Sequence, residues 1–327
     1  MKIEIYDNQQ DNTYTAKIWD GPDGIDDATF VCDSLGKCFE ELIRFRIMNG
    51  LTYVDDENPK EAIRSYFNSI DQNQFTEFEL KELKKCKYSP KYFINKYSPG
   101  IILRDYQEEL FDSFENHKIT LGSMCKQSGK TLTPLLYALH QIIFNQNYTV
   151  LVNSFDYYNT TERCLETIRN LYYALPEFFR RYVGVSLSTQ DKFVLENGSS
   201  VNIFNVNALE SYKPSRFNPD LTILDEYAFW KRENALNFMD CFALTLWSKK
   251  NNKMIVCSTP NGSRILENGK WVNQHFYELW TDDNPDINKI RVPYERVPFG
   301  DIEKMRLSLS PVEFAKEYSG LFITEEF

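Results

Sequence analysis

The chain has 327 residues, of which 42% are hydrophobic, so it can bury a large core as one large domain or as two smaller ones. Its formal net charge of −10 argues against a protein whose whole surface coats nucleic acid, although a local basic track is compatible with it. The sequence has no long apolar run, no signal-peptide segment and no C-x-x-C pair, which predicts a protein inside the cell without a membrane partner, zinc site or disulfide framework.

The first 88 residues are predicted to form an acidic N-terminal subdomain. Residues 1–60 contain 13 Asp and Glu against 6 Lys and Arg, so a polyanion is expected to bind to the larger part of the chain. The runs "KIEIYD" and "TYTAKIWD" predict short strands, and the stretch near Cys38–Met48 predicts a helix. The stretch "SPKYFINKYSPG" (89–100) has two Ser-Pro steps and a glycine, which predicts a connector to a domain over 89–327.

Beyond this connector, short apolar runs alternate with segments of helical spacing. Alternating strands and helices predict an α/β fold with a parallel sheet and crossover helices. The last two apolar runs, "DLTILDE" and "KMIVCSTP", are typical of strands that are buried on both faces. The expected elements are helix 102–114, strand 118–124, helix 130–145, strand 148–154, helix 160–174, a β-hairpin that turns at Asn197-Gly198, and strands 220–226 and 253–260.

The stretch "GSMCKQSGKT" (122–131) ends like a phosphate-binding loop, although Met124 stands where the usual pattern has its first glycine. A loop between a strand and a helix offers backbone N–H groups and a helix N-terminus to an anion. We expect Lys130 to reach the β- and γ-phosphates of ATP and the Thr131 hydroxyl to ligate Mg²⁺. The alternative is an ordinary strand-to-helix turn. The residues expected to bind the nucleotide here are Gln127, Ser128, Gly129, Lys130 and Thr131.

Two carboxylates, Asp225 and Glu226, follow the apolar run of "LTILDE" at the end of a predicted strand, where open α/β sheets bind ligands. Asp225 is expected to hold Mg²⁺, and Glu226 to orient or deprotonate the attacking water. A solvated acidic turn is the alternative. Because a strand–helix unit separates these residues from the G-K-T by about 95 positions, the two motifs together favour an NTPase.

Two further motifs fit the same chemistry. In "CSTPNG" (257–262), Thr259 is expected to sense the γ-phosphate, and Thr259 and Asn261 to couple hydrolysis to motion. In "LRDYQ" (103–107), the Gln107 amide can both donate to and accept from an adenine edge, and Arg104 or Tyr106 is expected to stack on the base. The alternatives are a plain exit from a strand and the start of an amphipathic helix.

In their order and spacing, "LRDYQ", "KQSGKT", "ILDE" and "STPNG" resemble the ATPase domain of the large terminase subunit of tailed bacteriophages, most closely the contractile-tailed branch. The resemblance covers roughly residues 90–327. It implies a RecA/ASCE-type P-loop NTPase with a mainly parallel central sheet flanked by helices, a smaller N-terminal subdomain, and a C-terminal lid-like segment over about 285–327. A phosphate loop that lacks its first glycine is usual in that family.

The resemblance also implies a function. It implies an enzyme that hydrolyses Mg-ATP to translocate double-stranded viral DNA into a procapsid, in the cytoplasm of the host cell. The implied partners are DNA, the portal protein, the small terminase subunit and other copies of the chain in a ring. In complete large terminases a nuclease domain follows the ATPase, and this sequence stops at "GLFITEEF", so we expect no nuclease activity from it.

The family also places charged residues at defined positions. Lys126 stands at a basic position proposed to act as a finger in cis, although lysine lacks the planar fork of arginine. Arg216 matches a position that resembles a finger acting in trans on a neighbouring subunit. The lysines of "WSKKNNK" (Lys249, Lys250 and Lys253) are candidate contacts to the DNA backbone. A surface charge is the alternative for each of these residues.

Two other functions remain open from the sequence. A helicase-like or restriction-type motor shares the glutamine-containing adenine motif and the Asp-Glu strand end. A regulatory module that uses ATP as a docking switch, without hydrolysing it, would share the phosphate loop.

Overall fold

The computed structural model divides the chain into two compact units, Met1–Tyr88 and Ser89–Phe327. The helix expected near Cys38–Met48, the candidate finger Arg216, and Lys249 and Lys250 lie outside the described residues. The structure describes residues 2–8, 13–19, 28–32, 75–155, 161–203, 218–248, 251–267, 270–298 and 302–323.

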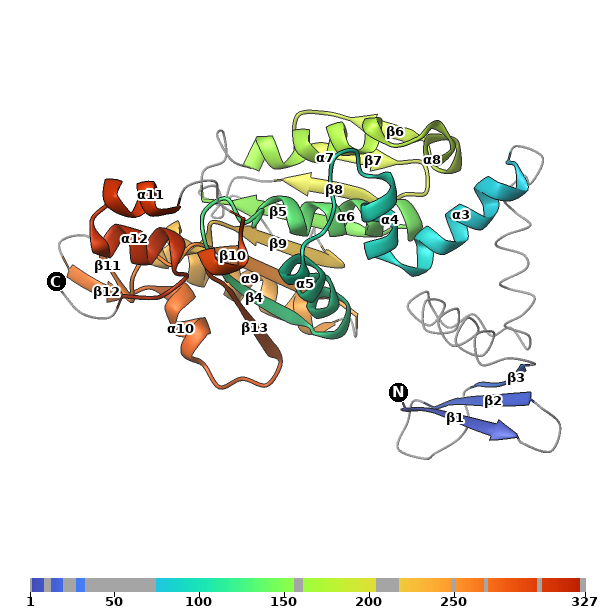
Figure 1. Ribbon diagram of the computed structural model, residues 1–327, viewed down its shortest axis with the longest axis horizontal. Helices are drawn as coiled ribbons and strands as arrows, with labels where there is room; N and C mark the ends of the chain where they lie inside the picture. The colour runs from blue at the N-terminus through green and yellow to red at the C-terminus, as the bar shows by residue number, and fades with distance from the viewer. Residues whose placement is uncertain are drawn as a thin grey trace. The chain divides into compact units, whose positions relative to one another are not determined.

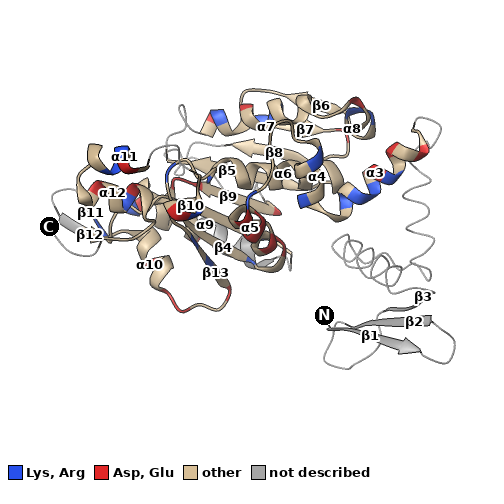
Figure 2. Cartoon of the chain, in the orientation of Figure 1, with Lys and Arg blue, Asp and Glu red and all other residues tan. Residues whose placement is uncertain are grey.

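In the smaller unit, three antiparallel strands form a sheet in the order β1-β2-β3 (Lys2–Asn8, Thr13–Trp19, Ala28–Cys32). The strands predicted from "KIEIYD" and "TYTAKIWD" are therefore confirmed. The unit also contains helix α3 (Glu77–Tyr88). Although the start of the chain is acidic, α3 is rich in lysine, as its blue segments show (Figure 2). Its lysines are Lys81, Lys84, Lys85 and Lys87.

The larger unit is built on a mixed sheet whose order is β13-β4-β10-β9-β5-β8-β7-β6. The six strands from β13 to β8 run parallel, and β7 and β6 continue the sheet antiparallel (Figure 1). The mainly parallel α/β sheet expected from the sequence is confirmed. In chain order the strands are β4 (Ile119–Met124), β5 (Thr149–Ser154), β6 (Val185–Ser188), β7 (Lys192–Leu195), β8 (Ser200–Ile203), β9 (Leu221–Asp225), β10 (Lys253–Ser258) and β13 (Ile287–Val292).

Helices and short turns connect these strands and flank the sheet (Figure 1). The predicted helices 102–114, 130–145 and 160–174 correspond to α5, α6 and α7, and the hairpin at Asn197-Gly198 corresponds to β7 and β8. The helices are α4 (Pro90–Tyr97), α5 (Asp105–Asn116), α6 (Leu132–Phe144), α7 (Glu162–Ala174), α8 (Glu177–Tyr182), α9 (Arg232–Ser248), α10 (His275–Thr281), α11 (Ile302–Ser308) and α12 (Pro311–Tyr318). Two 3₁₀ turns, η5 (Tyr227–Phe229) and η6 (Tyr294–Arg296), and a hairpin, β11 (Arg264–Glu267) with β12 (Lys270–Asn273), complete the unit.

The side chains of β9 alternate between the two faces of the sheet, and this alternation positions the carboxylate at its end. Leu224 packs into an apolar cluster with Trp230 and Phe238 on one face. Successive residues of a strand point to opposite faces, so Asp225 points to the other face. All five residues of β9 are buried, as expected for a strand in the middle of a parallel sheet.

The structure corrects two expectations about segments. Residues 89–100 are not a connector, because they contain helix α4: the Ser89 hydroxyl accepts a hydrogen bond from the Tyr92 N–H at 3.2 Å, and Pro90 occupies the first turn. Serine as the cap followed by proline favours the start of a helix. The lid-like segment expected over 285–327 begins with β13, which is an edge strand of the central sheet beside β4. Among the described residues, no helix is long and apolar enough to span a membrane.

Candidate nucleotide-binding site

The loop between β4 and α6 turns through two residues in the left-handed region, Gln127 (φ 61°) and Gly129 (φ 79°). The Ser128 hydroxyl folds back and donates to the carbonyl oxygen of Cys125 at 2.7 Å. Glycine adopts this conformation freely, whereas a left-handed glutamine is strained, as is common in functional loops. A side chain at position 129 would also approach the Gln107 amide nitrogen to 3.0 Å. The left-handed conformation therefore favours glycine at position 129, and the space beside it is tight.

Lys130 lies at the inner end of the loop and forms an ion pair with Glu226, at 2.9 Å from its Oε1. The side chains of the two residues are 13% and 21% exposed, respectively. Burial works against the charged form of Lys130, but the nearby carboxylates, with Glu226 contributing most, together raise the pKa of Lys130. The ammonium is therefore charged at neutral pH, as binding of a phosphate requires.

Thr131 and Asp225 form the second contact between the loop and β9. The Thr131 hydroxyl donates to Asp225 Oδ2 at 2.7 Å, and Asp225 is 3% exposed. Burial, together with the charge of the neighbouring Glu226, raises the pKa of Asp225 to about 6. Asp225 Oδ1 and Glu226 Oε2 are buried and have no hydrogen-bond partner. Buried oxygens of this kind are costly unless a ligand satisfies them.

The Asp225 carboxylate and the Thr131 hydroxyl are suitable ligands for Mg²⁺. Mg²⁺ prefers oxygen ligands, and in phosphate sites it uses one or two carboxylates while waters and phosphates supply the rest. Asp225 and Thr131 offer a carboxylate and a hydroxyl of the right kind at adjacent positions. Among the described residues, no group of three or more His, Cys, Asp or Glu side chains could hold a metal by itself.

Glu226 has a left-handed backbone (φ 50°, ψ 37°), which costs a non-glycine residue roughly 1 kcal/mol. The turn that follows it is held from several sides. The Ala228 N–H donates to the Ser258 hydroxyl at 3.1 Å, and the Gln274 side chain donates to the Ala228 carbonyl at 2.9 Å. The Trp230 indole donates to the Asp225 carbonyl at 3.2 Å. These bonds hold the main chain on both sides of Glu226.

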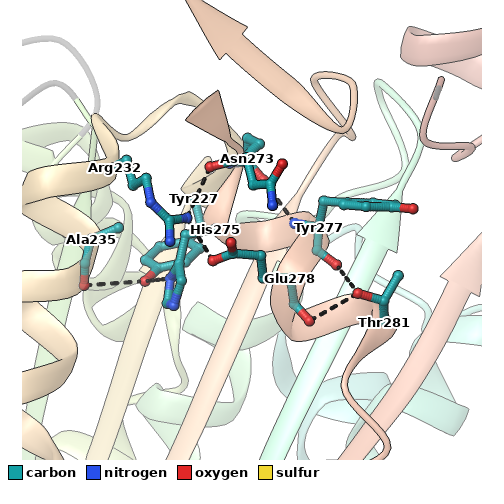
Figure 3. A network of polar contacts seen from close by, with 9 residues as sticks. Tyr227, Arg232, Ala235, Asn273, His275, Tyr277, Glu278 and Thr281 are labelled. Atoms are coloured by element: carbon teal, nitrogen blue, oxygen red, sulfur yellow. Dashed lines mark hydrogen bonds and ion pairs between the residues drawn. The ribbon is translucent and has the colours of Figure 1, made fainter. Parts of the chain in front are cut away.

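A polar network continues from this turn to α10 (Figure 3). The Tyr227 hydroxyl lies 2.9 Å from His275 Nδ1, and Arg232 forms an ion pair with Glu278 at 2.5 Å. Arg232 also donates to the Asn273 carbonyl at 2.9 Å. The turn after Glu226 is therefore connected to β12 and α10, which the sequence motifs did not indicate.

The end of β10 lies beside the same turn. Cys257 is in register with Asp225, and Ser258 with Ser123 of β4. Thr259 follows directly and is 3% exposed, and Gly262 has the positive φ (81°) expected of a turn. The residue of this segment that contacts the Glu226 turn is Ser258, which the motif analysis passed over. The coupling roles of Thr259 and Asn261 stay predictions.

The "LRDYQ" segment contacts the phosphate loop and α6 through Tyr106 and Gln107, and this changes the interpretation of both residues. The Tyr106 ring is fully buried and its hydroxyl donates to the Ser128 carbonyl at 2.9 Å, so the expectation that Tyr106 stacks on a base is wrong for this conformation. The Gln107 oxygen accepts from the Arg104 N–H at 3.1 Å, and its nitrogen donates to the Thr133 hydroxyl at 2.9 Å. Gln107 thus uses its amide to hold the loop, and its contact with an adenine stays a prediction. Arg104 is exposed and stays a candidate for stacking.

Three functional candidates escaped the sequence analysis. Lys126 lies 3.4 Å from the carboxylate of Glu317 in α12, a residue that no motif singled out. Asn153 and Ser154 end β5 next to β9, and Ser154 is in register with Asp225. Both are buried, and Asn153 Nδ2 and Ser154 Oγ have no hydrogen-bond partner. Asn153 and Ser154 could have been found from the sequence, because they are polar residues at the end of an otherwise apolar strand. No sequence signal indicated Glu317, because it is far along the chain from Lys126 and the other motif residues.

Solved structures that are similar to this chain include large terminases. The ATPase domain of the large terminase of Thermus phage P74-26 is 17% identical, with a TM-score of 0.56, over 72% of this chain and 98% of that chain. The large terminase of bacteriophage HK97 is 14% identical, with a TM-score of 0.54, over 72% of this chain and 55% of that chain. The large terminase of a thermophilic bacteriophage, in complex with ADP, is 11% identical, with a TM-score of 0.50, over 68% of this chain and 54% of that chain.

The fold is that of the large terminase ATPase domain. The resemblance inferred from the four motifs is thereby confirmed at the level of structure, as is the α/β P-loop fold. No protein-family model matches the chain. The chain spans nearly the whole isolated ATPase domain of the P74-26 enzyme but about half the length of the HK97 large terminase.

Proposed function

We propose that this chain binds and hydrolyses Mg-ATP and is the ATPase module of a motor that drives double-stranded viral DNA into a procapsid. The observation that carries the proposal is the meeting of two distant motifs. Lys130 of the loop contacts Glu226, which directly follows β9, at 2.9 Å, and Thr131 contacts Asp225 at the end of β9 at 2.7 Å. The large terminase fold supports the choice of a packaging motor among ATPases.

In the proposed mechanism, Lys130 binds the β- and γ-phosphates, and Thr131 and Asp225 hold the metal. Mg²⁺, when bound, neutralises charge on the phosphates. The triphosphate competes with Glu226 for the Lys130 ammonium, which frees the Glu226 carboxylate to orient and deprotonate water. The strained backbone of Glu226 and the bonds around Ala228 keep that carboxylate directed into the site. Breaking the Lys130–Glu226 pair is thus part of nucleotide binding.

As a motor, the module acts with partners in the cytoplasm of an infected bacterium. The proposed partners are duplex DNA, the portal protein, the small terminase subunit and further copies of the chain in a ring, in which Arg216 reaches a neighbour's nucleotide. Lys249 and Lys250 stay candidates for contacts to the DNA backbone. Lys253 is a weaker candidate, because its ammonium donates to the Glu115 and His117 carbonyl groups at 2.8 and 3.4 Å.

The test separates binding from chemistry. Glu226→Ala should abolish phosphate release from ATP while ATP still binds, because Lys130 and the loop are intact. Turnover is measured against protein concentration and added duplex DNA, since groups acting in trans are absent from an isolated subunit. Wild-type turnover by Glu226→Ala would refute the assignment. A wild-type chain that binds ATP but never hydrolyses it, at any concentration and with DNA, would favour the ATP-switched docking module.

A further inference from the structure

The last residue of β5, Ser154, has a buried hydroxyl with no hydrogen-bond partner among the described residues. Ser154 is 1% exposed. Its backbone N–H, by contrast, donates to the Asn153 side-chain oxygen and to the Thr161 hydroxyl, both at 3.1 Å. The main chain of Ser154 is therefore held, while its hydroxyl can still donate one hydrogen bond and accept two. A buried polar group of this kind costs stability unless a ligand satisfies it.

Ser154 lies beside Asp225 on the same face of the sheet. Strands β5 and β9 are parallel, and the two residues are in register. Neighbouring strands are about 4.8 Å apart, and residues in register point to the same face. Thr131 bonds to Asp225 Oδ2, whereas Asp225 Oδ1 is buried and has no partner in the described part of the chain. Two buried side chains with unpaired oxygens are therefore neighbours at the proposed metal site.

The other neighbours of Asp225 on this face are thiols. Cys257 of β10 is in register with Asp225 and is 1% exposed. Cys164 of α7 is also buried, and burial, together with the charge of Asp225, raises the pKa of its thiol. Thiols are weak hydrogen-bonding groups. Of the two residues in register with Asp225, Ser154 is thus the one that offers a strong hydrogen-bonding group.

The chemistry of hydrated Mg²⁺ matches this pair of oxygens. Mg²⁺ in nucleotide sites keeps several of its water ligands. Because the oxygen of such a water faces the metal, both of its hydrogens need acceptors. Asp225 Oδ1 and Ser154 Oγ can each accept one of them. Two hydrogen bonds through one water span roughly 5.5 Å, a distance suited to side chains on adjacent strands.

We propose that Ser154 is a positioning residue for the metal: its hydroxyl accepts a hydrogen bond from a water ligand of Mg²⁺ and so raises the affinity of the nucleotide site for Mg²⁺. The inference rests on the proposed function, because it requires a nucleotide and a metal at the loop. Partners that bind the ligands of a metal, and not the metal itself, raise its affinity about 10- to 100-fold. Ser154 acts through a single hydrogen bond, so the lower end of this range is expected.

The test compares nucleotide binding with and without the metal. Calorimetry on the full chain gives the affinity for ATPγS over a series of Mg²⁺ concentrations and in EDTA. Ser154→Ala should raise the Mg²⁺ concentration for half-maximal tightening of ATPγS binding about tenfold. The affinity for ATPγS in EDTA should equal that of the wild type, because Lys130 and the loop are intact. A Mg²⁺ requirement that does not change in Ser154→Ala would overturn the inference.

Stability without ligands separates this role from a structural one. Ser154→Ala removes a buried hydroxyl that has no partner, so the ligand-free variant should unfold at the same temperature as the wild type or higher. Ser200→Ala is the matched control, because Ser200 is a buried serine at the start of β8 whose hydroxyl accepts from the Asn202 side chain at 3.0 Å. It should unfold earlier and keep the Mg²⁺ requirement of the wild type.

Two further results would count against the role of Ser154. A ligand-free Ser154→Ala that unfolds as early as Ser200→Ala would show that the hydroxyl serves the fold. An equal loss of ATPγS affinity with Mg²⁺ and in EDTA would show general damage to the site. Failure of the wild-type chain to bind ATPγS at any Mg²⁺ concentration would instead overturn the proposed function itself.

Discussion

The two lysines of the phosphate loop lie in opposite environments. Lys130 is 13% exposed and 2.9 Å from its carboxylate, whereas Lys126 is 56% exposed and 3.4 Å from its own. Water screens charges at the surface far more than charges in a buried site. The comparison shows that burial, more than position in the motif, distinguishes the ion pair inside the site from the ion pair at the surface.

The largest effect is expected at the inner lysine. Lys130→Met should lower ATP turnover about 100- to 1,000-fold, because it removes a buried charge aimed at the phosphates. Lys126→Met should have a clearly smaller effect, because its charge is screened by water. Steady-state phosphate release by both variants measures the difference. Equal losses would show that exposure does not rank the two lysines.

A second prediction concerns pH, because the pKa of Asp225 is raised to about 6. An unfolded aspartate has a pKa near 4, so the folded chain holds this proton more tightly and its stability should increase as the pH falls from 7 through 6. Asp225→Asn removes this dependence. Without Mg²⁺, the variant should be more stable than wild type at pH 7 by on the order of 2 kcal/mol, and by about half as much at pH 5.

Denaturant unfolding at the two pH values measures the effect of Asp225→Asn. Asp105→Asn is the control: the backbone N–H of Tyr106 and the nearby Arg296 lower the pKa of Asp105. The contribution of Asp105 is lost only as the pH falls below about 4, so its variant should show no change between pH 5 and pH 7. A pH-independent difference between Asp225→Asn and wild type would contradict the raised pKa.

Gln107→Ala tests whether the "LRDYQ" segment supports the loop or reads a base. It removes the bonds to the Arg104 N–H and the Thr133 hydroxyl, so it should destabilise the fold by about 1–3 kcal/mol. ATP and GTP binding should weaken equally. A selective loss of ATP binding would restore the role in adenine recognition. Gln190→Ala, at an exposed glutamine bonded to Glu162, is the matched control and should leave stability nearly unchanged.

The smallest effect is expected at Lys253. Its ammonium donates to carbonyl groups at the C-terminal end of α5, so Lys253→Ala should lower stability by about 0.3–1 kcal/mol. DNA binding and its salt dependence should be unchanged. Paired measurements of thermal unfolding and of duplex binding over a salt series check both statements. A shallower salt slope in this variant would return Lys253 to the DNA contacts.

Local patterns were sufficient for much of the fold. The runs that became β4, β5, β9 and β10 are short, apolar and bounded by turn residues, and the segments between them have helical spacing. Residues 89–100 were wrongly predicted to be a connector, because a Ser-Pro step can follow the end of one helix or form the start of another. Here Ser89 caps α4, and its Phe93 and Ile94 are buried, which stabilises the helix. The burial of Phe93 and Ile94 depends on the tertiary structure.

By itself, the sequence determined the phosphate loop, the Asp-Glu end of β9 and their order, because each depends on a short run of neighbouring residues. Tertiary structure alone decided which side chains meet: Lys130 with Glu226, Gln107 with Thr133, and Lys126 with Glu317. Lys126 and Glu317 are far apart in the sequence of the larger unit, although their side chains are in contact. The physical reason is that β10 and β13 lie on either side of β4, so the carboxyl ends of distant strands, and the α12 segment that follows β13, come together at one edge of the sheet.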